Sequence, residues 1–137
     1  MFNRAMGLFV TLLILGCGGS DGGKTPGIPE GASEGIVQTR DMLLESSMMA
    51  IKLSKLDDVN NFESKFPKAV AAVKDKSVVI VWGKTFKEGV TPESAEIMAY
   101  EAKAADQGGW VVKNNGELYQ MSASDFAAKA PKTSAKK

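Results

Sequence analysis

The chain has 137 residues, with 17 basic and 16 acidic side chains, one cysteine and no histidine. Its net charge of +1 creates no strong field, so a nucleic-acid partner is not indicated. Without histidine, catalytic sites of the Ser/His/Asp or Cys/His type cannot form, and a zinc site of histidine and cysteine is excluded as well. We therefore expect no metal, no cofactor and no catalytic residues. One cysteine also excludes an internal disulfide, so the fold must rest on an apolar core.

The N-terminal residues have the pattern of a secretory signal. Arg4 is the only charged residue before an apolar run that extends from Met6 to Leu15. A helix of about ten residues rises about 15 Å, which is half of the ~30 Å hydrocarbon core of a bilayer. The run is too short for a good membrane-spanning helix. We expect a cleaved signal peptide over 1–16 rather than a buried helix of a cytosolic domain.

The apolar run ends at the cysteine. Ile14-Leu15-Gly16-Cys17 resembles the lipobox of bacterial lipoproteins, in which an aliphatic residue, a tolerated residue and a small residue precede an invariant cysteine. The resemblance implies signal cleavage after Gly16 and lipidation of Cys17 by acyl chains such as palmitate. Two or more acyl chains anchor a protein stably to a membrane. The expected partner at this end is the membrane, through the lipid on Cys17, and the expected location is the cell envelope, facing the periplasm or the exterior. Gly18 replaces the aspartate that favours inner-membrane retention in diderm lipoproteins, which favours the outer membrane.

A glycine-rich segment follows Cys17. Residues 18–35 contain seven glycines and two prolines, a composition that cannot bury enough apolar area to become ordered. We predict a flexible tether over 17–33, with an r.m.s. span of roughly 20–25 Å. The tether leads to a single globular domain over 34–130, and a lysine-rich tail follows over 131–137.

The domain is expected to begin with a helix over 34–55. Apolar side chains recur there at three-and-four spacing, with polar side chains largely on the other side. The adjacent pair Met48 and Met49 is interpreted as core packing rather than as a copper site. The expected apolar face consists of Ile36, Leu43, Leu44, Ser47, Met48 and Ile51.

A second helical stretch follows with the same period. Asp57 or Asp58 is its expected N-cap, and Pro67 should break or kink it near Phe66. The expected core positions are Val59, Phe62, Phe66, Ala69, Val70 and Val73.

The strands are expected in the second half. The β-branched run Ser77–Gly83 predicts a buried strand. Residues 109–121 predict a hairpin, in which Asn115-Gly116 forms a two-residue type I′ turn. That turn pairs Val112 with Tyr119. One face of the hairpin then carries Trp110, Val112, Tyr119 and Met121, and the other carries Val111, Lys113, Leu118 and Gln120.

The segment 91–104 fits either a helix starting at Thr91-Pro92 or a strand over 96–101. Residues 97–126 resemble the C-terminal tail of a family of secreted, prepilin-like bacterial proteins. That tail runs aliphatic-Leu-Ala-Tyr-Glu, a loop with a histidine, a strand, Asp-Gly-x-Val and a short acidic helix. The resemblance implies a strand at Met98-Ala99-Tyr100-Glu101, which favours the strand over the helix. Here Asn115-Gly116 replaces Asp-Gly, and Ala105 replaces the histidine.

The expected fold class is α+β, with two N-terminal helices packed on a small antiparallel sheet of three to four strands. A short C-terminal helix follows, capped by Ser122 and stopped by Pro131. The aromatic residues Trp82, Tyr100, Trp110 and Tyr119 are expected in the core rather than as a sugar-stacking platform.

Two classes of function fit these features. The first is a membrane-anchored, non-catalytic interaction or assembly module with an envelope protein partner. The second is a small ligand-binding domain or a carboxylate-dependent enzyme, and its candidate residues are Glu93, Glu96, Glu101 and Glu117. We favour the first, because histidine and a free cysteine are lacking. A concave pocket with convergent polar groups would support the second class, and an exposed apolar patch the first.

Overall fold

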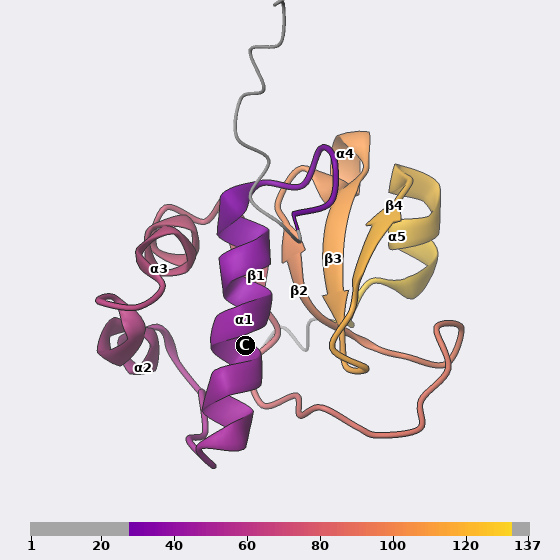
Figure 1. Cartoon of the computed structure of the whole chain (residues 1–137). Helices are drawn as coiled ribbons and strands as arrows, with labels where there is room; N and C mark the ends of the chain where they lie inside the picture. Colours follow the sequence, from indigo (N-terminus) through magenta and orange to yellow (C-terminus); the bar gives the residue numbers. More distant parts are fainter. Residues whose placement is uncertain (1–27, 133–137) are drawn as a thin grey trace, which may run out of the picture.

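Within residues 28–132, the part of the chain described by this computed structural model, four strands form an antiparallel sheet with helices on both faces (Figure 1). Each strand pairs with its neighbours in sequence, in the order β1-β2-β3-β4. The α+β class, the small antiparallel sheet and the short C-terminal helix are confirmed. The strands are β1 (Val78–Ile80), β2 (Ile97–Glu101), β3 (Gly109–Lys113) and β4 (Leu118–Met121). The helices are α1 (Glu34–Met48), α2 (Leu56–Val59), the 3-10 helix η1 (Asn60–Phe62), α3 (Pro67–Lys74), α4 (Ala104–Gln107) and α5 (Ala123–Lys129).

Helix α1 begins where the sequence predicts. Ser33 is the N-cap, and its hydroxyl oxygen accepts a hydrogen bond from the N–H of Ile36 at 3.3 Å. The helix packs against α3 and across the sheet. Its buried face is rotated from the predicted one and consists of Ile36, Val37, Thr39, Met42, Leu43 and Ser46.

The end of α1 differs from the prediction of a helix over 34–55. Ala50 has a φ of 55°, so the chain leaves the helix after Met48. The N–H groups of Ala50 and Ile51 donate to carbonyls of the last turn at 3.1 and 2.8 Å, which is the pattern of a Schellman cap. Met48 and Met49 therefore project past the core, with 87% and 58% of their surface exposed. Their interpretation as core residues is wrong.

Pro67 divides the second helical stretch, as predicted. Helix α3 begins at Pro67, and Phe66 is its N-cap. The short helices α2 and η1 take the place of a continuous first part. The predicted N-cap is wrong, because Lys55 precedes α2 and the Asp58 carboxylate, inside the first turn, accepts from the Lys55 N–H at 3.1 Å. All six predicted core positions are buried: Val59, Phe62, Phe66, Ala69, Val70 and Val73.

Two apolar cores lie on opposite faces of the sheet. Helices α1 and α3 cover one face, which carries Val78, Ile80, Ala99 and Val112. Helix α5 covers the other face, which carries Ile97, Val111 and Met121 and where the rings of Tyr100 and Phe126 lie 4.8 Å apart. The sequence predicted one buried face and one mixed face, but α5 closes the second face too. Both cores are built from residues 28–132, so a chain that starts at residue 17 keeps every contact described here.

Strands β3 and β4 form the predicted hairpin with a different turn. The loop has three residues, 114–116, and is closed by a hydrogen bond from the Lys113 N–H to the Glu117 carbonyl at 3.0 Å. Gly116 has a φ of 86°, whereas Asn115 does not have the positive φ that a type I′ turn requires. The register therefore shifts by one residue, and each β4 side chain moves to the face opposite the predicted one. Trp110, Val112 and Leu118 face α1, while Val111, Tyr119 and Met121 face α5.

The ambiguous segment 91–104 forms a strand, as the sequence favours. The Thr91 carbonyl accepts from the N–H groups of Ser94 and Ala95, at 3.1 and 2.9 Å, so a single turn forms there. The strand β2 then begins at Ile97. At the other end of the hairpin, the Ser122 hydroxyl accepts from the third residue of α5, which confirms its predicted role as a cap.

The described chain begins with a turn that packs on the domain. Ile28 and Ala32 lie against the core beneath α1, and the Ala32 N–H donates to the Pro29 carbonyl at 3.1 Å. Residues 28–33, predicted as the end of the tether, therefore contact the domain. The predicted signal peptide, Gly16 and Cys17 lie outside the described residues.

Candidate functional site

A groove with a volume of about 300 Å³ opens at the C-terminal end of α1. Three segments form its walls: the last turn of α1, the extended segment 50–53, and the segment 81–86 that follows β1. Its floor consists of the buried side chains Leu43, Leu53, Ile80 and Met98.

Local structure holds the walls in place. The left-handed residue Ala50 turns the chain back from α1, and the buried side chain of Leu53 fixes the returning segment. On the other wall, the Val81 N–H donates to the Met98 carbonyl at 2.7 Å, which continues the pairing of β1 with β2. Phe86 packs against the core farther along this wall. Both walls are therefore anchored to the core beneath the groove.

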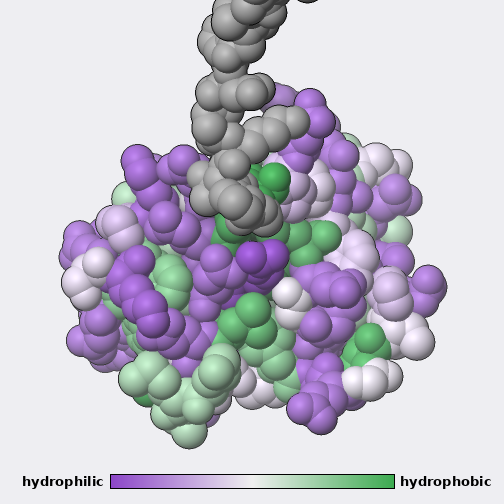
Figure 2. Space-filling view, viewed as in Figure 1, coloured by the Kyte–Doolittle hydropathy of each residue, from purple (hydrophilic) through white to green (hydrophobic). Residues whose placement is uncertain are grey.

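Exposed apolar side chains lie in the walls of the groove or next to them in the sequence. Met48 and Met49 project from the end of α1, Ile51 is 39% exposed on one wall, and Trp82 is 37% exposed between two residues of the other wall. We call the groove together with these four side chains the apolar end. In Figure 2, hydrophobic atoms gather at the lower side of the molecule, where α1 ends in Figure 1. Apolar surface of this kind commonly marks an interaction site.

Two lysines lie at the groove. Lys52 and Lys84 line it, and none of its lining residues is acidic. The Lys84 ammonium is 3.0 Å from a carboxylate oxygen of Glu96, which holds the lysine in place. Lys52 has no acidic partner within 4 Å among residues 28–132. The charge at the groove is therefore positive.

Glu101, a candidate carboxylate, is buried and only 3% exposed. Its two oxygens accept hydrogen bonds from the N–H of Ser33 at 3.2 Å and the N–H of Trp110 at 3.0 Å. The ammonium of Lys103 lies 3.4 Å away. Burial raises the pKa of this carboxyl, but the hydrogen bonds and the lysine outweigh burial and leave the pKa below its usual value. The group is ionised and fully engaged in holding backbone.

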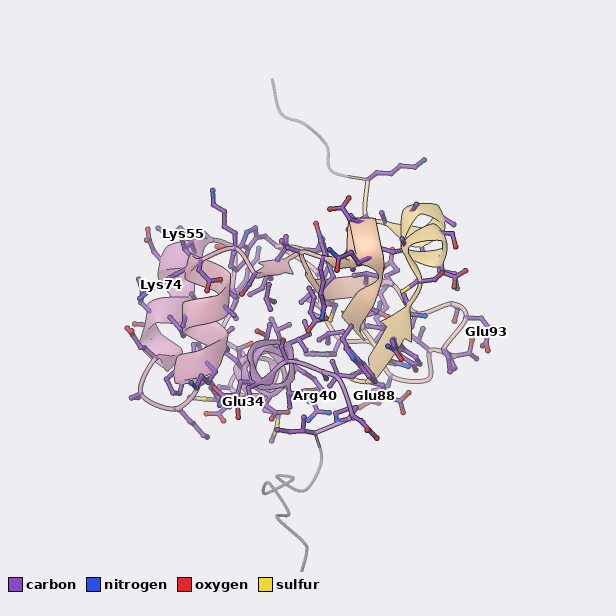
Figure 3. All side chains as sticks on the ribbon, turned by 90° about the horizontal axis from the view of Figure 1, so that it is seen from above. Glu34, Arg40, Lys55, Lys74, Glu88 and Glu93 are labelled. Atoms are coloured by element: carbon purple, nitrogen blue, oxygen red, sulfur yellow. The ribbon has the colours of Figure 1, made fainter. Side chains whose placement is uncertain are left out.

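The other candidate carboxylates have separate partners. The hydrogen bond and charge of Lys84 hold the pKa of Glu96 below its usual value. Glu117 accepts from the hydroxyl of Tyr119. Figure 3 places Glu93 at the periphery of the molecule, where a hydrogen bond from its own N–H lowers its pKa. None of the four candidates lines the groove, and the structure does not bring them together at it.

Lys113, on β3, is a buried cation that the sequence analysis did not single out. It is 5% exposed, donates to the Pro92 carbonyl at 2.7 Å, and lies 4.5 Å from the ring centre of Tyr119. Burial, with the charge of Lys129, lowers the pKa of this lysine. Its contacts attach the turn before β2 to the sheet, which is a structural role.

The four singled-out aromatic residues do not form a platform. Tyr100 and Tyr119 pack toward α5, and Trp110 packs toward α1. Trp82 is exposed at the apolar end, so its predicted place in the core is wrong.

The residues that the structure describes hold neither a grouped set of metal ligands nor a membrane-spanning helix. Between Ile28 and Lys132, no three His, Cys, Asp or Glu side chains are grouped so as to hold a metal ion. In the same range, no helix combines the length and the apolar character needed to cross a bilayer. No protein-family model, curated protein or solved structure matches this chain.

Proposed function

We propose that this protein is a membrane-anchored envelope lipoprotein that acts as a non-catalytic interaction or assembly module, and that it holds a protein partner by its apolar end. The observation that carries the proposal is the exposure of Met48 and Met49, at 87% and 58%, beside an apolar groove. Contiguous exposed apolar surface is uncommon on proteins without partners. Methionine suits such a surface, because its flexible thioether adapts to the shape of a partner.

The placement of the apolar end supports this role. The described chain enters through residues 28–33, which end in the N-cap of α1, whereas the apolar end lies at the other end of that helix. A helix of 15 residues is about 22 Å long. A lipid on Cys17, joined through the tether, would leave the apolar end directed away from the attachment point. Confinement to a membrane would also raise its effective concentration toward a neighbouring partner.

The carboxylates support a non-catalytic role. A general acid needs a raised pKa, whereas those of Glu93, Glu96 and Glu101 are lowered by hydrogen bonds and lysines. Glu101 is occupied by backbone N–H groups.

The test is cross-linking in intact cells followed by purification of the full-length protein from membranes. We expect a discrete cross-linked protein with the wild type, and at least a roughly tenfold smaller yield with Met48→Ser combined with Met49→Ser, because the docking surface loses its apolar side chains. The matched control is Gln107→Ser combined with Gln120→Ser, two exposed positions away from the groove.

Two results would contradict the proposal. One is a cross-linked partner whose yield is the same in the methionine variant and in the wild type. The other is turnover of a hydrolase substrate by the purified protein that disappears in Glu101→Gln or Glu117→Gln, with folding intact.

A further inference from the structure

The groove combines a buried apolar floor with two lysines in its lining, and this combination points to a ligand. We propose that the groove binds a single-chain amphiphile with an anionic head group, such as a fatty acid. The chain lies over the buried floor and the carboxylate lies beside Lys52 and Lys84. This site goes beyond the interaction proposed above, and it requires neither a lipid on Cys17 nor a protein partner.

The floor of the groove provides an apolar surface for the chain. Leu43 on α1, Leu53 in the segment 50–53, Ile80 on β1 and Met98 on β2 are all buried. The volume of about 300 Å³ is at the small end of the range for ligand sites. A helix with its side chains is about 10–12 Å wide, so even one turn, about 5.4 Å long, needs more than this volume. An unbranched chain fits where a partner helix does not.

The groove selects the sign of the head group. Its two charged lining residues, Lys52 and Lys84, are cations, and no acid lines it. Glu96 holds the Lys84 ammonium at 3.0 Å and takes up part of its charge. Lys52 is exposed and has no such partner among the described residues, which leaves it as the main attraction for a carboxylate. The hydroxyls of Ser47 and Thr85, also in the lining, are further hydrogen-bond donors.

The test uses residues 17–137 with Cys17→Ser, a chain that retains both cores, labelled with ¹³C at the methionine methyl groups. Met98 reports on the groove, Met121 on the opposite core, and Met48 and Met49 on the exposed end of α1. Decanoate and decylamine, which share one chain length and differ in charge, are titrated below micelle formation. We expect a saturable shift of the Met98 methyl with decanoate and no shift of Met121. The affinity for decylamine should be lower by roughly tenfold.

Three variants distinguish the contribution of the ligand's apolar chain from that of its head group. Lys52→Glu should lower the affinity for decanoate by roughly tenfold and should not lower the affinity for decylamine. Lys68→Glu makes the same charge change in the first turn of α3, outside the groove, and should leave both affinities unchanged. Ser47→Phe, at an exposed position in the groove lining, should weaken both ligands by occupying the space for the chain.

Three outcomes would overturn the inference. They are no saturable shift of Met98, equal affinity for the two head groups, or shifts confined to Met48 and Met49. The last would mean adsorption to the exposed methionines alone. Because no membrane and no partner is present, failure here leaves the proposed function standing, and loss of the cross-linked partner leaves this site standing.

Discussion

The buried carboxylate of Glu101 joins three parts of the chain at a single point. Glu101 is the last residue of β2. Its carboxylate accepts hydrogen bonds from the N–H of Ser33, before α1, and from the N–H of Trp110, on β3. Gly109 makes this approach possible, because a Cβ atom there would lie 2.9 Å from a Glu101 oxygen. A residue considered as a candidate for catalysis is thus one that determines how α1 meets the sheet.

Glu101→Gln should lower the free energy of unfolding at pH 7 by about 2 kcal/mol. The amide is a weaker acceptor than the carboxylate, and its NH₂ group would face one of the two N–H donors. Urea unfolding measures the change. Glu96→Gln, at an exposed position, is the control and should leave stability nearly unchanged, because exposed ion pairs contribute little. Equal effects of the two substitutions would contradict the assigned role of Glu101.

The pH dependence of stability should reflect the same carboxylate. Since hydrogen bonds and Lys103 hold the pKa of Glu101 below its usual value despite burial, its contribution is fully present above the unfolded pKa, about 4.3. This contribution is lost as the pH falls through the folded pKa. Thermal unfolding between pH 7 and pH 3 should therefore show a shallower acid loss for Glu101→Gln than for the wild type. Parallel curves would show that Glu101 does not contribute to the acid sensitivity.

Among the elements, the C-terminal cap of α1 has an unusual residue at its left-handed position. Ala50 has a φ of 55°, which is unfavourable for a residue with a Cβ atom. Ala50→Gly should raise the free energy of unfolding by about 1 kcal/mol. Ala71→Gly, at an exposed position inside α3, should lower it by about 0.5–1 kcal/mol. A loss of stability in both variants would mean that Ala50 is helical.

The turn of the hairpin has one position that requires glycine. Gly116 has a φ of 86°, and a Cβ atom there would also lie 3.4 Å from the side chain of Leu44. Gly116→Val should lower the free energy of unfolding by about 1–3 kcal/mol, because a β-branched residue resists positive φ. Gly116→Asn should be milder, since asparagine tolerates this conformation better. Chemical denaturation of the two variants tests the order, and valine tolerated as well as asparagine would contradict the turn.

Local patterns predicted the elements better than their ends. The spacing from Val59 to Val73 predicted six buried positions, because a helical period and a proline leave few alternatives. The end of α1 was missed because alanine, unlike glycine, carries no stop signal. Adjacent side chains of α1 can both be buried, as Ile36 with Val37 and Met42 with Leu43 show, so the sequence pattern alone does not separate Met48 and Met49 from core positions.

The hairpin register was decided by contacts distant in sequence. Asn115-Gly116 is compatible with a two-residue or a three-residue loop. The Asn114 amide oxygen accepts from the Glu96 N–H at 2.9 Å, and its main chain bonds to Glu96 and Lys87 at 2.8 Å each. These contacts accompany the three-residue loop. The groove also depends on contacts between residues distant in sequence. Its lining comes from separate segments of the chain, and no sequence motif connects them.

At the scale of the whole molecule, the proposed lipid lies at one end of the chain and the proposed binding surface lies at the far end of α1. The structure describes the domain over 28–132, and the apolar end lies away from the turn through which the chain enters. If Cys17 carries no lipid, the exposed methionines and the groove could still bind a partner or a ligand, but the protein would not be held at a membrane through Cys17.

The most direct measurement of the central proposal is the intact mass of the protein recovered from bacterial membranes. We predict the mass of residues 17–137 increased by acyl chains attached to Cys17. Cys17→Ser should abolish the added mass and release the protein from the membrane fraction or leave it uncleaved. Recovery of the complete 137-residue chain, without added mass and in the water-soluble fraction, would contradict the proposal.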